Sequence, residues 1–133
     1  MTGLRQDVVR YRLHRAQETL EDAQILARAK RWQPCVNRLY FACFYAVSAL
    51  LFQHDYSSPK HTGVRSLFNQ HFVMTGKVPK TLAQVYNDLF SRRQESDYLD
   101  FVRFEASQVQ PLITGAEQFV ECIAALIEGF SAA

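Results

Sequence analysis

The chain has 133 residues, of which 48% are hydrophobic and 21% charged, and these proportions predict a single globular domain over residues 1–133. They argue against intrinsic disorder, and five glycines and four prolines are too few for a collagen-like, linker-rich or many-turned β protein. The formal net charge of +2 is too small to indicate nucleic-acid binding by itself.

Two long helices are predicted in the first part of the chain. Apolar residues step by three and four positions from Leu13 to Ala27, which predicts an amphipathic helix over about residues 5–31. Pro34 suits the first turn of a helix but not its interior, so a turn comes just before it. The second helix, over about residues 34–53, is apolar nearly all round, which indicates a central position covered on most sides.

A short third helix is predicted after a loop over residues 55–60. Its apolar residues lie between Val64 and Phe72, and Gly76 fits a left-handed cap just past its end. A fourth helix follows Pro79 and is expected to end near Tyr98.

The region from Phe101 to Ala106 is less regular, and a fifth helix is expected from about Ser107, with Pro111 in its first turn. No segment alternates with period two for long enough to form a strand. The predicted fold is therefore all-α, an antiparallel bundle of four to five helices.

The cysteines and the N-terminus favour a cytoplasmic protein. Cys35, Cys43 and Cys122 are an odd number without a CxxC motif, which is typical of buried thiols in a reducing compartment. No apolar signal segment is visible at the N-terminus. The longest apolar stretch, residues 39–52, is shorter than the ~20 residues that span a bilayer, so a core helix is predicted and no membrane association.

Charge is distributed unevenly along the chain. Residues 1–40 hold eight Arg or Lys against four Asp or Glu, whereas residues 104–133 hold four Glu and no base. This pattern fits complementary solvated faces within one bundle, and it also fits a basic surface for an anionic partner.

Two arginines occupy positions where a buried stripe predicts apolar residues. Arg93 follows Leu89 by four residues on the fourth helix, and Asp97 lies one turn beyond it. Arg38 precedes Phe41 by three on the second helix. A guanidinium in such a place must be paired or must face a pocket, and it suits bidentate contact with phosphate or carboxylate.

Two interpretations of these arginines stay open. One is a structural Arg–Asp pair that fixes helix register. The other is a polar cleft between the second and fourth helices that binds a phosphate-bearing group. The residues predicted to line that cleft are Asn37, Arg38, Tyr45, Arg93, Asp97 and Tyr98.

Other common chemical motifs are missing from the sequence. The four histidines show no HxxxH spacing and no accompanying carboxylate pattern, so no metal or other cofactor is predicted. His61 is interpreted as a residue at the start of the third helix, with catalysis as the less favoured role.

Several segments, in order, resemble small prokaryotic HEPN-domain proteins. The first is residues 37–46, Asn-Arg-Leu-Tyr-Phe-Ala-Cys-Phe-Tyr-Ala, and residues 60–64 and 71–79 follow in the expected order. The segment from Leu89 to Tyr98 is similar to the Arg-then-Asp-Tyr ending of one HEPN branch. The resemblance covers about residues 8–128.

The resemblance implies a helical bundle that forms homodimers and is paired with a minimal nucleotidyltransferase in toxin–antitoxin modules. Many HEPN domains are metal-independent endoribonucleases with an Arg, a spacer of four to six residues and a His. There Arg stabilises phosphate charge and His transfers a proton during attack by the ribose 2′-OH.

This sequence departs from that motif, because no His follows His71. Arg93 matches the arginine, and Tyr98 stands at the first position allowed for the histidine. An unperturbed Tyr titrates near ~10 and is a poor proton carrier at neutral pH. Tyr98 is therefore predicted to donate a hydrogen bond or to be modified by a partner nucleotidyltransferase.

The resulting prediction is a dimeric, toxin-like or partner subunit of a nucleotidyltransferase module. Arg38 and Arg93, with Asn37 and Tyr45, would bind RNA or a nucleotide phosphate. The alternatives are a non-catalytic protein-docking module and a weak metal-independent endoribonuclease that uses Arg93 with Asp97 or Tyr98.

Overall fold

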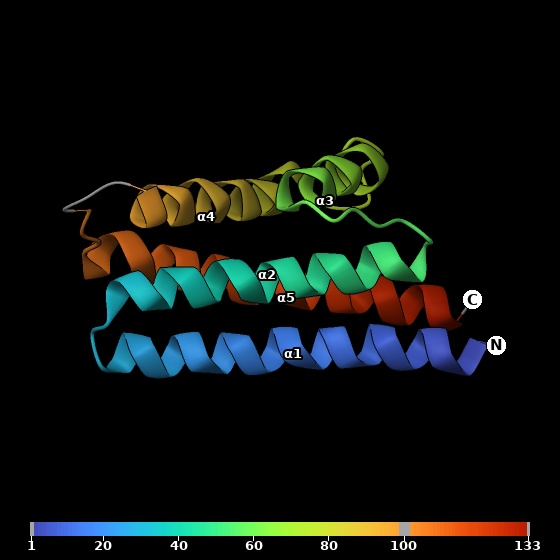
Figure 1. The fold of residues 1–133 in the computed structure, drawn as a ribbon, viewed down its shortest axis with the longest axis horizontal. Helices are drawn as coiled ribbons and strands as arrows, with labels where there is room; N and C mark the ends of the chain where they lie inside the picture. The colour runs from blue at the N-terminus through green and yellow to red at the C-terminus, as the bar shows by residue number, and fades with distance from the viewer. Residues whose placement is uncertain (1, 99–101, 133) are drawn as a thin grey trace.

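The computed structural model describes residues 2–98 and 102–132, and every regular element within them is helical (Figure 1). The α-helices are α1 (Thr2–Arg28), α2 (Trp32–Gln53), α3 (His61–Phe68), α4 (Lys80–Tyr98) and α5 (Ala106–Ala132). A π-helix, η1 (Asn69–Val73), continues α3. The predicted all-α bundle is confirmed.

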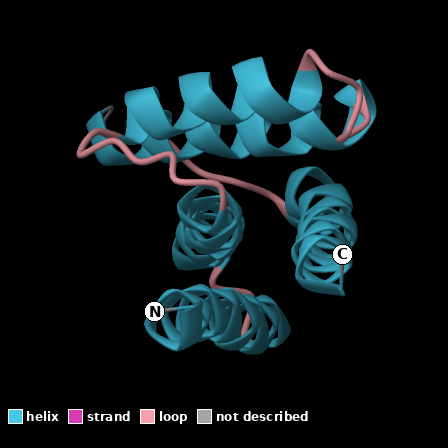
Figure 2. Cartoon of the chain, turned by 90° about the vertical axis from the view of Figure 1, so that its right-hand side faces the viewer, coloured by secondary structure: helices cyan, strands magenta, loops and turns pink. Residues whose placement is uncertain are grey.

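The helices form two layers. α1, α2 and α5 run along the long axis, and α3 and α4 lie across them, as the end-on view makes clear (Figures 1 and 2). α1 and α2 are antiparallel, whereas α2 and α5 run in the same direction. The end of α1, the end of α4 and the beginnings of α2 and α5 therefore meet at one end of the molecule.

α2 is the central helix, as its composition predicts. It packs against α1, α4 and α5, and its buried side chains include Leu39, Tyr40 and Leu50. By length and composition alone α2 is apolar enough to cross a membrane, but 61% of its most apolar stretch is buried within this fold. Its hydropathy is explained by the helices that surround it.

α2 packs against small residues of α1 on one side and against aromatic residues of α4 and α5 on the other. Ala16 and Ala23 of α1 are fully buried and, having small side chains, allow α1 to approach α2 closely. On the other side, Tyr86 of α4 lies with its ring centroid 6.0 Å from Tyr40 and 5.5 Å from Phe119 of α5. These rings join the two layers of the fold.

The helix boundaries differ from the predicted ones in several places. α2 begins at Trp32, so Pro34 is in its first turn as predicted. The third helix is divided into α3 and η1, which the apolar pattern does not distinguish. The prediction for Pro111 is wrong: α5 begins at Ala106, and Pro111 lies beyond its first turn.

Gly76 and the cysteines bear out their predictions in part. Gly76 has φ +80°, the left-handed conformation expected of it. Cys35 and Cys43 are buried free thiols, and burial raises the pKa of Cys35 to about 11. Cys122 is half-buried instead of fully buried.

Candidate functional site

Arg93 reaches from α4 onto two aromatic rings of α2. Its guanidinium carbon lies 5.1 Å from the ring centroid of Tyr40 and 5.1 Å from that of Phe41. Its side chain is 24% exposed, so the charge is only partly withdrawn from water. Cation–π contact with electron-rich ring faces accounts for a guanidinium at an otherwise apolar position.

Asp97 pairs with Arg93 as the spacing predicts. Nε of Arg93 lies 3.4 Å from Oδ2 of Asp97 one turn along α4, and the aspartate side chain is 38% exposed. The pair lies at the edge of the fold and not in its interior, so its contribution to stability is small. Tyr98 is the last residue of α4, and its side chain lies outside the described part of the structure.

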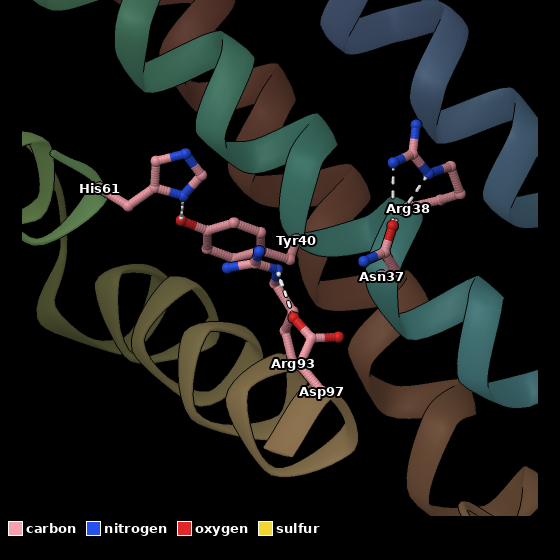
Figure 3. Close-up of polar contacts among 6 residues, drawn as sticks. All are labelled: Asn37, Arg38, Tyr40, His61, Arg93 and Asp97. Atoms are coloured by element: carbon pink, nitrogen blue, oxygen red, sulfur yellow. Dashed lines mark hydrogen bonds and ion pairs between the residues drawn. The ribbon is translucent and has the colours of Figure 1, made fainter. Parts of the chain in front are cut away.

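Arg38 shares an aromatic ring with Arg93. Its guanidinium carbon also lies 5.1 Å from the Phe41 centroid, so the two guanidinium carbons are at most twice 5.1 Å apart. Nε and Nη2 of Arg38 donate hydrogen bonds of 3.2 and 2.9 Å to Oδ1 of Asn37. Figure 3 shows the Arg38–Asn37 and Arg93–Asp97 pairs as separate groups.

Tyr45 turns toward α1. Its hydroxyl oxygen accepts a hydrogen bond of 3.1 Å from Nη2 of Arg15, whose guanidinium carbon lies 5.0 Å from the Tyr45 ring centroid. The Tyr45 and Phe41 centroids are 5.9 Å apart. Tyr45 is thus connected to the two predicted arginines through Phe41, and it brings a further cation, Arg15, to the same surface.

His61 is a member of the site that sequence reasoning missed. It is the first residue of α3, and its Nδ1 lies 2.9 Å from the hydroxyl oxygen of Tyr40 (Figure 3). Its ring stacks on Phe44, with centroids 4.2 Å apart. Figure 3 shows the Tyr40 side chain between His61 and Arg93, so α2, α3 and α4 each contribute one polar group to one cluster.

Burial sets the protonation of this cluster. Desolvation lowers the pKa of His61, and the positive charge of Arg93 lowers it further. Burial raises the pKa of Tyr40 to about 12, against the opposing effect of Arg93. At neutral pH the cluster therefore holds a neutral imidazole, a protonated phenol and a guanidinium.

No short-range sequence pattern indicates that His61 belongs to the site. His61 lies far outside the window of four to six residues after Arg93, and nothing in its own helix pattern connects it with α4. Only the packing of α3 against α2 brings its ring to Tyr40. Arg65, one turn further along α3, is a second cation on this side, with its guanidinium carbon 4.1 Å from the Phe90 centroid.

The chemistry available here is recognition of an anion beside a neutral base. Over residues 2–98 and 102–132, no three His, Cys, Asp or Glu side chains are grouped so as to hold a metal ion. The half-exposed guanidinium groups carry donors suited to the oxygens of a phosphate. Arg38 lies on α2, Arg93 on α4 and Arg65 on α3, and none of them lines the open cavity at the end of the bundle.

Comparison with known proteins identifies the family. Residues 9–126 match the model of the HEPN domain. A UPF0332 protein of Thermotoga maritima is 44% identical over 124 residues, covering 93% of this chain and 94% of that protein. A UPF0332 protein of Gloeobacter violaceus, glr0978, is 35% identical, covering 74% of this chain and 75% of that protein.

A more distant relative has a name that refers to function. It is the Methanocaldococcus jannaschii protein named "Putative toxin MJ0142", which is 27% identical over 76% of this chain and 69% of its own length. The family model covers well over half of the sequence, and its all-helical fold agrees with the structure described above. This chain therefore belongs to the HEPN domain family.

Proposed function

We propose that this chain is a toxin-like HEPN subunit that binds RNA or a nucleotide phosphate through Arg38 and Arg93. The observation that carries the proposal is the pair of guanidinium groups on the Phe41 ring, each only half-buried. Arg38 has an amide and Arg93 a partly exposed carboxylate as its polar neighbour, so each keeps donors for an incoming phosphate.

The proposal also includes the setting of the protein. It would act in the cytoplasm as a homodimer, paired with a minimal nucleotidyltransferase that modifies or holds it near Tyr98. The toxin name of the archaeal relative and the HEPN family membership support this setting. Sedimentation should give twice the chain mass, and a monomer at micromolar concentration would contradict the dimer.

The binding proposal is tested with Arg93→Gln. We expect about tenfold weaker binding of a short single-stranded RNA, because a charge-assisted contact is lost. The slope of log affinity against log salt should become shallower by about 0.7, as expected for one lost phosphate contact. Filter binding at several salt concentrations measures both quantities.

The matched control is Arg92→Gln. Arg92 precedes Arg93 on α4 but, within the described residues, has no ring contact or ion pair. The Arg92→Gln variant should bind RNA with nearly the affinity of the parent protein. If Arg93→Gln lowers only the free energy of unfolding and leaves affinity unchanged, Arg93 is structural and the binding proposal is wrong.

A second function, metal-independent RNA cleavage, is favoured by the position of His61. The contact between Nδ1 of His61 and the Tyr40 hydroxyl is compatible with either tautomer of the imidazole. Cleavage requires the tautomer in which Nδ1–H donates to the Tyr40 oxygen, because Nε2 then has a free lone pair. Nε2 would accept the proton of a ribose 2′-OH, whose oxygen then attacks the neighbouring phosphorus. The P–O5′ bond breaks to leave a 2′,3′-cyclic phosphate, and the leaving O5′ takes up a proton from water, while Arg93 stabilises the phosphate charge.

The cleavage hypothesis predicts that His61→Ala lowers the rate by about 100-fold, the usual size of a general-base effect. His71→Ala is the control, because His71 stacks on Tyr56, at a ring-centroid distance of 4.0 Å, and has no contact with the cluster. Chelator should have no effect on the rate, and a strand with 2′-deoxyribose should stay intact. Equal activity of the two histidine variants would exclude His61 as the base.

A further inference from the structure

A concave site lies at the end of the bundle where α1 meets α2, the left-hand end in Figure 1. It is an open cavity of about 580 Å³, and its walls come from residues 30–34 and 102–104. That volume is within the usual range for small-molecule sites, about 300–1,000 Å³. It shares no residue with the cluster around Arg93.

Among the described residues that line this cavity, every charged side chain is cationic. Lys30, Arg31 and Arg103 all line it and are all exposed. None of the three forms an ion pair with a carboxylate anywhere in residues 2–98 and 102–132, in contrast to Arg5 with Asp55. Three unpaired cations around a concavity raise the local concentration of anions.

The helix that begins in this cavity adds to the positive potential. α2 starts at Trp32, and its N-cap residue, Arg31, makes no side-chain capping bond to the first turn. The positive end of the α2 dipole and the N–H groups of its first turn are therefore near the three cations. An anion is the ligand that satisfies them together.

An aromatic wall limits the class of anion. Trp32 lines the cavity and is half-buried, packed against the core, and Phe104, which also lines the cavity, is 7% exposed. A large flat ring next to a cationic concavity suits a ligand that carries both a planar ring and a negative charge. Nucleotides have this combination, whereas an acidic peptide would use only the charge.

A hydrogen bond links the two walls of the cavity. Nε2 of Gln33 donates a hydrogen bond to the carbonyl oxygen of Val102 and so joins the beginning of α2 to the segment before α5. Backbone bonds from Lys30 N–H to Ala27 and from Arg31 N–H to Leu26 close the end of α1.

We propose that this bundle-end cavity, formed by residues 30–34 and 102–104, binds a nucleotide unit, with its phosphate on Lys30, Arg31 and Arg103 and its base against Trp32. The unit is either a free nucleotide or one nucleotide of a single-stranded RNA. The site is additional to the Arg38–Arg93 surface and acts independently of it.

The chain carries its own reporter for this proposal, because Trp32 is its only tryptophan. At low salt the full chain is titrated with AMP, with a five-residue oligoadenylate, with adenosine and with tetraglutamate, and Trp32 emission is followed. We expect a saturable change with AMP or the oligonucleotide and little change with adenosine, which lacks phosphate. A change with both AMP and the oligonucleotide identifies a free nucleotide as sufficient, and a change with the oligonucleotide alone identifies an RNA strand.

Substitutions inside and outside the cavity test whether this site is the one that binds the ligand. Arg103→Gln should weaken binding by about tenfold, as the loss of one charge-assisted contact predicts. Arg10→Gln removes the same charge from an exposed position of α1 outside the cavity and should have little effect. Arg93→Gln should leave the Trp32 signal unchanged even if it abolishes RNA binding at the other surface.

Three results would overturn the proposal. The first is an emission that none of the ligands changes. The second is an equal response to tetraglutamate and AMP, which would indicate a non-specific or peptide-binding cationic surface. The third is an equal loss of response in Arg10→Gln and Arg103→Gln, which would show that net charge and not this cavity is responsible.

Discussion

Single residues in this protein are held in place by aromatic neighbours and by backbone geometry more than by ion pairs. Arg93, Arg38 and Arg15 each lie about 5 Å from the ring centroid of an α2 side chain. An exposed cation–π contact contributes about 0.5–1 kcal/mol and keeps a guanidinium near apolar surface without neutralising it. The charges therefore stay available to a ligand.

Lys30 has a backbone conformation that is unfavourable for its residue type. It has φ +59° just past the end of α1, where the left-handed conformation is unfavourable for a residue with a Cβ. Lys30→Gly should raise the free energy of unfolding by about 0.5–1 kcal/mol, the relieved strain less the greater freedom of glycine in the unfolded chain. Urea denaturation measures this change.

Asp55→Gly is the comparison for Lys30→Gly. Asp55 has φ +66°, but aspartate tolerates this conformation better, and its carboxylate pairs with Arg5. Asp55→Gly should therefore raise the free energy of unfolding by less than Lys30→Gly does. A destabilised Lys30→Gly variant would mean that its side chain stabilises the turn by more than the strain it causes.

At the scale of elements, the approach of one helix to another depends on small residues at a few positions. A Cβ placed on Gly115 of α5 would lie 2.9 Å from Cγ2 and 3.1 Å from Cγ1 of Val85 on α4. Valine has little rotamer freedom with which to avoid that contact. Gly115 therefore sets how closely the crossing helix α4 packs on α5.

Gly115→Ala tests this contact between α4 and α5. Alanine is the better helix former by about 1 kcal/mol, but overpacking typically costs about 1–3 kcal/mol, so we expect net destabilisation. In a Val85→Ala background the same change should become stabilising, because the clash is removed. Thermal or urea unfolding of the four proteins gives the coupling energy, and additive effects would contradict the close approach.

At the scale of the whole molecule, the layered arrangement withdraws two histidines partly from water and favours their neutral form. Burial lowers the pKa of His61, with a further contribution from Arg93. Burial also lowers the pKa of His54, with Lys77 adding to the effect and Asp55 opposing it. A lowered pKa in the folded state means that the unfolded chain binds protons more readily than the folded one.

The free energy of unfolding should consequently fall as the pH is lowered from about 7 to 5, through the range in which an unfolded histidine with pKa near 6.5 becomes charged. Denaturation with urea at a series of pH values measures this dependence. His61→Gln should show a shallower fall than the parent, because one of the two sites is removed. A parent protein that gains stability over this range would contradict the lowered pKa of the two histidines in the folded state.

The amino-acid sequence was enough to predict the helical class, the central place of α2 and the i,i+4 pairing of Arg93 with Asp97, because these follow from periodicities within one helix. The family could also be predicted, from the order of the short motifs. The π-helical continuation of α3 and the position of Pro111 were not predicted, since boundaries depend on packing and not on composition.

Which residues share a site depends on how the helices pack. Tyr40, His61 and Arg93 come from three helices, and no local spacing connects them. The same holds for the cavity at the end of the bundle, whose two walls are separated by about half of the chain and meet because α1, α4 and α5 all have an end there. Periodicity specifies which face of a helix is buried, whereas the neighbours of that face are specified only by how the helices pack together.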